Sequence, residues 1–148
     1  MTLPAVSLDL APGKATIGLV EQVNNGLPLS AADDVSTVVA PGDRNFKYRL
    51  VPKATYARRL ALGRSSEKVK RARTPSLSKE ESERVVRLAR IWAFAREVMK
   101  DDTLTRRFLT TPHMLLNARA PLDVTLEGEL GGKLVEDILG RLAHGSAV

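Results

Sequence analysis

The fold is decided by residues 104–145, which read LTRRFLTTPHMLLNARAPLDVTLEGELGGKLVEDILGRLAHG. The stretch predicts a short helix that ends before Pro112, because the residue before a proline avoids helical geometry. A second helix should begin at Pro121, since proline is well tolerated in the first turn of a helix. A final helix should end at His144 and Gly145, where glycine readily takes the left-handed backbone of a helix cap.

The final helix carries a stripe of apolar side chains at helical spacing. The stripe consists of Leu134, Val135, Ile138, Leu139 and Leu142. Its members form two adjacent rows, 134/138/142 and 135/139, and we expect one row to pack inside the chain and the other to face a partner. The sequence does not decide which row is exposed. Before this helix, Gly128, Gly131 and Gly132 should let neighbouring backbones approach closely.

Two shorter segments of the same stretch should contribute to the core. The first helix should begin at Thr103, and the loop after Pro112 should turn two leucines inward. The expected inward side chains are Leu104, Phe108, Leu109, Leu115 and Leu116.

The composition favours a helical core. The chain has 148 residues, enough for one ordinary domain or two small ones, and only one Trp, two Tyr and three Phe. Such a core consists mainly of Leu, Val, Ile and Ala, so we expect an all-α fold. The absence of Cys excludes disulfides and suggests a reducing compartment. Because neither a signal peptide nor an apolar run of membrane-spanning length is evident, the expected location is the cytoplasm.

Positive charge is concentrated in the middle of the chain. Residues 1–43 carry five acids and one base, residues 44–73 carry eleven bases and one acid, and residues 74–148 carry eleven of each. The middle segment therefore supplies more than the whole net charge of +6. A basic segment of this kind in a helical region indicates a polyanionic partner, most often DNA or RNA.

The residues before the basic segment predict two helices after a flexible arm at residues 1–15. The first helix should be capped by Thr16 and end at Gly26. Its inward side chains should be Ile17, Val20 and Val23. The second helix should span residues 30–39.

The basic segment has the layout of a helix-turn-helix. A short helix with Phe46 and Leu50 inward is broken before Pro52, and a second helix opens at about Lys53. Its core face should consist of Ala57, Leu60 and Ala61. In a helix-turn-helix the second helix enters the major groove, where Thr, Tyr and Arg contact phosphates and base edges. The predicted DNA-binding residues are Lys53, Thr55, Tyr56, Arg58, Arg59 and Arg64.

Two alternatives remain open for these basic residues. Arg58 and Arg59 also fit an ordinary solvated helix face, although the basic run that continues to Arg73 favours nucleic-acid contact. Residues 63–73 also fit a flexible arm that is not part of the motif.

A long helix should follow, because Ser78 and Glu81 have the spacing of a capping box. We expect this helix to run to about Asp101. Its buried stripe should consist of Val85, Leu88, Ala89, Trp92, Ala95, Val98 and Met99. The expected exposed charges are Glu80, Glu83, Arg84, Arg87, Arg90 and Arg96.

An enzymatic function is not indicated. His113 and His144 are the only histidines, and no metal-ligand spacing is present. Glu127 and Glu129, two residues apart in a glycine-rich loop, fit a solvated turn better than a general acid/base pair. We therefore expect no catalytic, cofactor-binding or metal-binding residues.

The run FLTTPHMLLNARAPLDVTLEGELGGKLVEDILGRLAHG resembles the toxin-binding domain of the Xre/MbcA/ParS antitoxin family. The likeness rests on a leucine-rich helix, a Pro-His loop, a Pro-Leu helix start and a closing helix with a His-Gly end. These features correspond to Phe108 and Leu109, Pro112 and His113, Pro121 and Leu122, the helix over 135–142, and His144 and Gly145. The upstream run SLSKEESERVVRLARIWAFAREVM resembles the long helix of the family. One departure is Asn117 and Ala118, where many members have two glycines.

The resemblance implies a type II antitoxin that neutralises a RES-fold toxin, an enzyme that consumes NAD or transfers ADP-ribose to proteins. In that family the end of the closing helix and the tail cover the NAD entrance of the toxin. The resemblance also implies a homodimer within a toxin-antitoxin hetero-oligomer, binding to operator DNA, no membrane association and a location in the bacterial cytoplasm. The implied toxin-binding residues are Leu134, Val135, Ile138, Leu139, Arg141, Leu142, His144, Gly145, Ser146 and Val148.

The expected domain organisation has four parts. A flexible arm at 1–15 is followed by an Xre-like helix-turn-helix domain at 16–75, a connecting helix at 76–103 and a toxin-binding domain with a tail at 104–148. The alternative function is a helix-turn-helix transcriptional regulator without a toxin partner.

Overall fold

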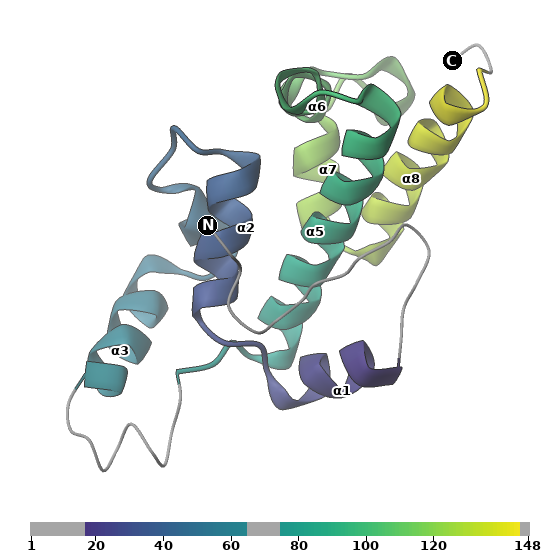
Figure 1. Cartoon of the computed structure of the whole chain (residues 1–148). Coiled ribbons are helices and arrows are strands. Elements are labelled where there is room, and N and C mark those ends of the chain that lie inside the picture. The colour runs from purple at the N-terminus through teal and green to yellow at the C-terminus, as the bar shows by residue number, and fades with distance from the viewer. Residues whose placement is uncertain (1–16, 65–74, 146–148) are drawn as a thin grey trace. The chain divides into compact units, whose positions relative to one another are not determined.

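The computed structural model describes residues 17–64 and 75–145, and its regular structure in these ranges is entirely helical (Figure 1). The described residues form seven α-helices and two short 3-10 helices, which confirms the predicted all-α fold class. No helix among them is both long and apolar enough to cross a membrane.

The described residues form two compact units that divide inside the long helix α5 (Lys79–Met99). The first unit ends at residue 85 and the second begins at residue 86. The predicted four-part organisation stays a prediction.

The first unit contains α1 (Ile17–Asn25), α2 (Ser30–Val39), the 3-10 helix η1 (Phe46–Arg49) and α3 (Lys53–Arg64), followed by the start of α5. These bounds confirm the helices that the sequence predicts. Its largest fully buried side chains are Leu27, Leu50, Val51 and Val85.

The chain between α1 and α2 pairs with the chain that leads into α5. Leu29 N donates to Pro75 O at 3.0 Å, and Leu77 N donates to Leu27 O at 2.7 Å. Gly26 has a φ of +87°, and an added Cβ would overlap the carbonyl oxygen of Leu77. Gly26 therefore ends α1, as predicted, and also allows this close pairing.

The predicted inward face of α1 is only partly correct. Val23 is buried, but Ile17 is 75 % exposed and Val20 is 45 % exposed. Among the described residues, the rest of the first unit covers α1 only near its end, where Val23 lies.

Helix α5 begins with the predicted capping box. The Glu81 carboxylate accepts from Ser78 N at 2.8 Å, and Ser78 Oγ accepts from Glu81 N at 3.1 Å. The same carboxylate accepts from Arg59 Nη1 of α3 at 2.5 Å. Glu81 thus joins the start of α5 to α3 within the first unit.

The second unit contains the rest of α5 and then α6 (Asp102–Thr110), the 3-10 helix η2 (Met114–Leu116), α7 (Pro121–Glu127) and α8 (Glu129–Ala143). Helix α7 packs along α8 and also contacts α6 (Figure 1). The largest fully buried side chains of this unit are Leu88, Ile91, Thr105, Leu109, Pro121, Thr125, Val135 and Leu139.

Several side chains of the second unit differ from expectation. Leu104 and Leu115 are about half exposed, whereas Leu109 and Leu116 are buried as predicted. Arg87 was expected to be exposed but is 7 % exposed, because its long stem packs inside and its guanidinium reaches carbonyl groups of α7.

The final helix is longer than predicted. It begins at Glu129, so Gly131 and Gly132 lie in its first turns and not before it. A Cβ at Gly131 would overlap the carbonyl oxygen of Val124, and one at Gly132 would lie 2.9 Å from Arg87 Cδ. The predicted close approach is therefore confirmed for these two glycines, but it is an approach of the helix itself to its neighbours.

Candidate functional site

Helix α8 presents an outward face with two large apolar side chains. Leu130 is 77 % exposed and Leu134 is 51 % exposed. Asp137 and Arg141 are also exposed and share this face, since successive residues of a helix are about 100° apart. We call Leu130, Leu134, Asp137 and Arg141 the outward face of α8. Exposed leucines beside charged groups are suited to a protein partner.

The opposite side of α8 holds the helix in the second unit. Val135, Ile138 and Leu139 are buried. The expectation that rows 134/138/142 and 135/139 would take opposite environments was therefore wrong, because Ile138 of the first row is buried with the second row. Leu142 lies near the same inward side but is 37 % exposed, since it comes at the end of the helix.

These positions divide the predicted toxin-binding residues into three groups. The exposed members are Leu134, Arg141, Leu142, His144 and Gly145. The buried members are Val135, Ile138 and Leu139, which support the helix and present little surface to a partner. Ser146 and Val148 lie outside the described residues. Gly145 has a φ of +69° and ends the helix as predicted.

The prediction missed Leu130, which is the most exposed large apolar side chain of α8. Leu130 precedes Leu134 by four residues, so both lie on one helix face. This spacing could have placed Leu130 on the helix, but Gly131 and Gly132 indicated a loop at this point. Both glycines are tolerated in the helix because the backbone of Val124 lies against Gly131 and the side chain of Arg87 lies against Gly132.

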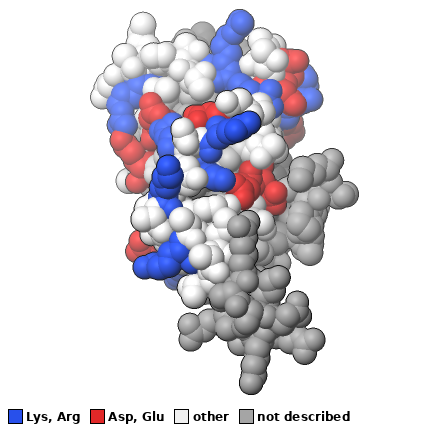
Figure 2. Space-filling model, turned by 90° about the vertical axis from the view of Figure 1, so that its left-hand side faces the viewer, with Lys and Arg blue, Asp and Glu red and all other residues white. Residues whose placement is uncertain are grey.

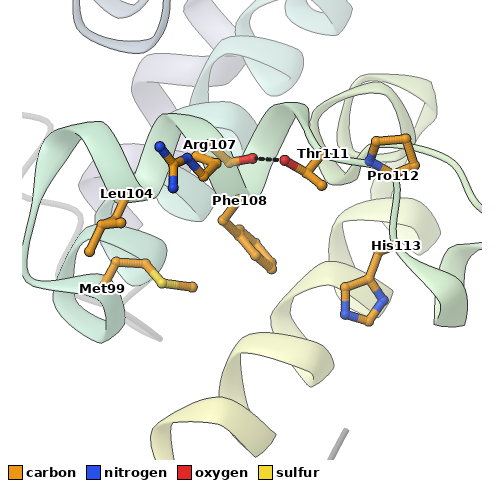
Figure 3. Close-up of a pocket in the computed structure, with 7 residues that line it drawn as sticks. All are labelled: Met99, Leu104, Arg107, Phe108, Thr111, Pro112 and His113. Atoms are coloured by element: carbon orange, nitrogen blue, oxygen red, sulfur yellow. Dashed lines mark hydrogen bonds between the residues drawn. The ribbon is translucent and has the colours of Figure 1, made fainter.

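A shallow apolar cavity of about 310 Å³ lies at the junction of α5, α6 and the loop that follows (Figure 3). It is lined by Met99, Leu104, Arg107, Phe108, Thr111, Pro112 and His113. Figure 3 shows the Phe108 ring and the His113 ring on the cavity side of their backbones. Their centroids are 6.4 Å apart in an edge-to-face arrangement, so the Pro-His loop packs on α6.

The loop after His113 has a fixed shape. His113 Nδ1 accepts from Leu115 N at 3.1 Å, and His113 N donates to Arg119 O at 3.0 Å. Asn117 and Ala118 both have left-handed backbones, with φ values of 54° and 61°. Glycine takes this conformation without strain, which explains why two glycines suit these positions and why Ala118 is strained.

Part of the predicted DNA-binding face of α3 points into the first unit. Tyr56 is 6 % exposed, and its hydroxyl donates to Asp33 Oδ2 of α2. The expectation that Tyr56 is available to solvent was therefore wrong. Ala57 and Ala61 were expected in the core but are exposed. The inward side of α3 is centred on Tyr56, about one residue, or 100° around the helix, away from the predicted side.

The remaining members of that prediction differ in their surroundings. Lys53 and Arg58 are exposed, and Thr55 is half-buried. Arg59 pairs with Glu81, as described above. The side chain of Arg64 lies outside the described residues.

Two lysines lie beside an aromatic pair formed by Tyr48 of η1 and Tyr56 of α3. The rings of Tyr48 and Tyr56 meet edge to face at 6.0 Å. Lys47 Nζ lies 4.7 Å from the Tyr56 ring centre, and Lys53 Nζ lies 5.7 Å from that of Tyr48. Lys47 also pairs with Asp33 at 3.3 Å. Figure 2 shows the side of the molecule that carries α3, with Lys and Arg spread over it and Asp and Glu between them.

Comparison with known proteins finds a similarity in the C-terminal part of the chain. Residues 94–145 match the model of the family described as the antitoxin Xre/MbcA/ParS C-terminal toxin-binding domain. No curated protein matches the chain significantly. The matched residues include the apolar cavity and all of α8. They agree with the resemblance that the sequence motifs indicate. Residues 94–145 are therefore similar to the C-terminal toxin-binding domain of the Xre/MbcA/ParS antitoxin family.

Proposed function

We propose that the chain is an antitoxin that binds and neutralises a RES-fold toxin, an enzyme that consumes NAD or ADP-ribosylates proteins. The end of α8 and the residues that follow it cover the NAD pocket of the toxin. The toxin class and this mode of inhibition come from the family resemblance.

The observation that best supports the proposal is the outward face of α8. Leu130 and Leu134 remain exposed although the same helix buries Val135, Ile138 and Leu139. Large apolar side chains that are exposed in the free protein stabilise a complex when the partner covers them and removes them from water. Because the inward side already fixes the helix, binding does not require the helix to fold first, which reduces its entropic cost.

The proposal also includes a homodimer within the toxin-antitoxin complex and repression of the antitoxin's own operon through DNA binding. The concentration of positive charge in residues 44–73 supports the DNA partner. The exposed side chains of Lys53 and Arg58 are the described members of the predicted set that are open to phosphate contact.

Growth rescue in a bacterial host tests the main proposal. The protein encoded next to this chain is expressed with and without the chain, while growth and cellular NAD are followed. We expect the neighbour alone to stop growth and this chain to relieve the arrest. A RES toxin that hydrolyses or phosphorolyses NAD should also deplete the cellular NAD pool.

The result also separates the proposal from its alternative. Arrest that the chain cannot relieve, or no arrest at all, would contradict the antitoxin proposal. A transcriptional regulator without a toxin partner would then be the better account, and DNA binding by residues 44–73 would be the property to measure.

A further inference from the structure

Two arginines of α5, one helical turn apart, hold the last two helices of the second unit. Arg87 is buried, and its Nε donates to Thr125 O at 2.6 Å, while its Nη2 donates to Leu126 O at 3.4 Å. Both acceptors belong to the last turn of α7, where carbonyl groups have no partner within the helix. Arg87 therefore supplies hydrogen bonds that α7 itself cannot make.

Arg90 holds α8 at two points along its axis. Its Nη2 donates to Glu129 at 2.7 Å, and its Nε donates to Glu136 at 2.6 Å. Burial alone would lower the pKa of the Arg90 guanidinium, but the hydrogen bonds and charges of the two carboxylates raise it above its ordinary value. Glu129 is the first residue of α8 and Glu136 follows two turns later. A planar guanidinium bound to both carboxylates fixes the direction of α8 and not only its distance.

The glycines of α8 set how closely the helix approaches this pair. Gly131 lies against the carbonyl group of Val124, and Gly132 lies against the stem of Arg87. At Gly140, by contrast, an added Cβ would have no atom within 4 Å. The first turns of α8 are thus tightly fixed, whereas residues 141–145, at and just beyond the end of the helix, are exposed.

We propose that Arg87 and Arg90 are positioning residues for toxin binding, because they fix the direction in which α8 presents its outward face. This inference rests on the proposed function. Arg87 is buried and Arg90 is engaged with two carboxylates, so their effect on the toxin passes through α8. A small change in the direction of a helix moves its far end the most, and that end is the part proposed to reach the NAD pocket.

The test measures binding of the full chain to the toxin encoded beside it. Arg90→Gln removes the charge that holds both carboxylates, and we expect it to weaken binding roughly tenfold. Arg90→Lys keeps the charge but cannot hold both carboxylates in a planar fork, so its loss should be intermediate. Arg119→Gln is the matched control, because Arg119 forms an exposed ion pair with Glu127 of α7 and not with the α8 carboxylates that Arg90 holds, and it should bind as wild type does.

A covalent replacement distinguishes positioning from direct contact. The chain has no Cys, so Arg90→Cys with Glu136→Cys gives a single pair of thiols. A short bismaleimide joins them and restores a link between α5 and α8. We expect the double variant to bind weakly before the reaction and nearly as wild type does after it. Circular dichroism and thermal unfolding of each variant confirm that it is folded at the temperature of the binding measurement.

Each outcome decides the inference. Equal binding of wild type and Arg90→Gln would overturn it, and so would weak binding that the crosslink does not restore, since Arg90 would then contact the toxin itself. Wild-type chain that does not bind the neighbouring protein would contradict the proposed function, and the inference with it. The two failures are distinguishable, because a failure of the proposed function is already seen in the binding measurement on the wild type.

Discussion

Gly131 and Gly140 occupy the same helix but have different surroundings. Alanine at Gly140 meets nothing within 4 Å, so Gly140→Ala should raise the free energy of unfolding by up to about 1 kcal/mol, since alanine favours helices more than glycine does. Alanine at Gly131 would overlap the carbonyl oxygen of Val124, so Gly131→Ala should lower it by about 1–3 kcal/mol. Urea unfolding of both variants measures the difference. Equal effects of the two substitutions would contradict the close contact between α7 and α8.

Glu81 makes stability depend on pH. Burial raises the pKa of its carboxyl group, but hydrogen bonds from Arg59 and Ser78 and the charge of Arg59 outweigh it and hold the pKa below its ordinary value of 4.5. Because the folded state holds this proton less tightly than the unfolded state, the carboxylate stabilises the fold above the unfolded pKa. That contribution is lost as the pH falls through the folded value.

Glu81→Gln should therefore lower the free energy of unfolding by about 1–2 kcal/mol at neutral pH. The variant should also lose less stability than wild type on acidification below about pH 4.5, because its amide does not titrate there. Urea unfolding over a series of pH values measures both effects. Glu80→Gln is the control, because Glu80 is an exposed neighbour in the same helical turn. Parallel pH curves for wild type and Glu81→Gln would rule out this role.

At the scale of elements, the two sides of α8 should have different roles. Residues on its buried side should affect stability, and residues on its outward face should affect toxin binding. Leu134 is half exposed and Val135 is fully buried, although they are adjacent. Leu134→Ala should weaken toxin binding about tenfold and change the free energy of unfolding by less than about 0.5 kcal/mol. Val135→Ala should lower the free energy of unfolding by about 2 kcal/mol. Calorimetric titration and thermal unfolding measure the two effects, and a Leu134→Ala variant that binds normally would remove the outward face from the interface.

Element starts and stops were predictable where the chemistry is local. The Ser78–Glu81 capping box, the helix start at Pro121 and the stop at Gly26 each depend on residues within one turn of the chain. Side-chain orientation was less predictable. Tyr56 is buried because Asp33, 23 residues earlier, accepts its hydroxyl hydrogen bond, and a pattern within α3 carries no sign of that partner.

The candidate site was predictable to a similar degree. The apolar stripe of α8 identified the right helix, but both rows contain buried residues. Leu130 was missed, because glycines that usually indicate a loop lie inside the helix where Val124 leaves no room for a side chain. Contacts from α7 and α5 decide which side of α8 is exposed, and α5 lies far from α8 in sequence.

At the scale of the whole molecule, the proposed binding to DNA should depend on the positive charge concentrated in residues 44–73. Protein cations that contact phosphates release counterions, and each contact adds about 0.9 to the slope of log affinity against log salt concentration. Lys53 and Arg58 are exposed on α3, so replacing both with alanine should weaken DNA binding and reduce that slope by roughly two.

Arg59→Ala is the informative comparison, because Arg59 is bound to Glu81 and not open to phosphate. It should leave the salt slope nearly unchanged but lower the free energy of unfolding by about 1–3 kcal/mol, since it removes a hydrogen bond between charged groups. Fluorescence anisotropy with operator DNA at several salt concentrations measures the slopes. A different result would be an unchanged salt slope for the Lys53→Ala/Arg58→Ala variant and a reduced salt slope for Arg59→Ala. The phosphate contacts would then lie on the side of α3 that carries Arg59 and its contact with Glu81 of α5. Arg59 would then have to leave Glu81 on binding, and DNA affinity would depend on breaking the capping contact of α5.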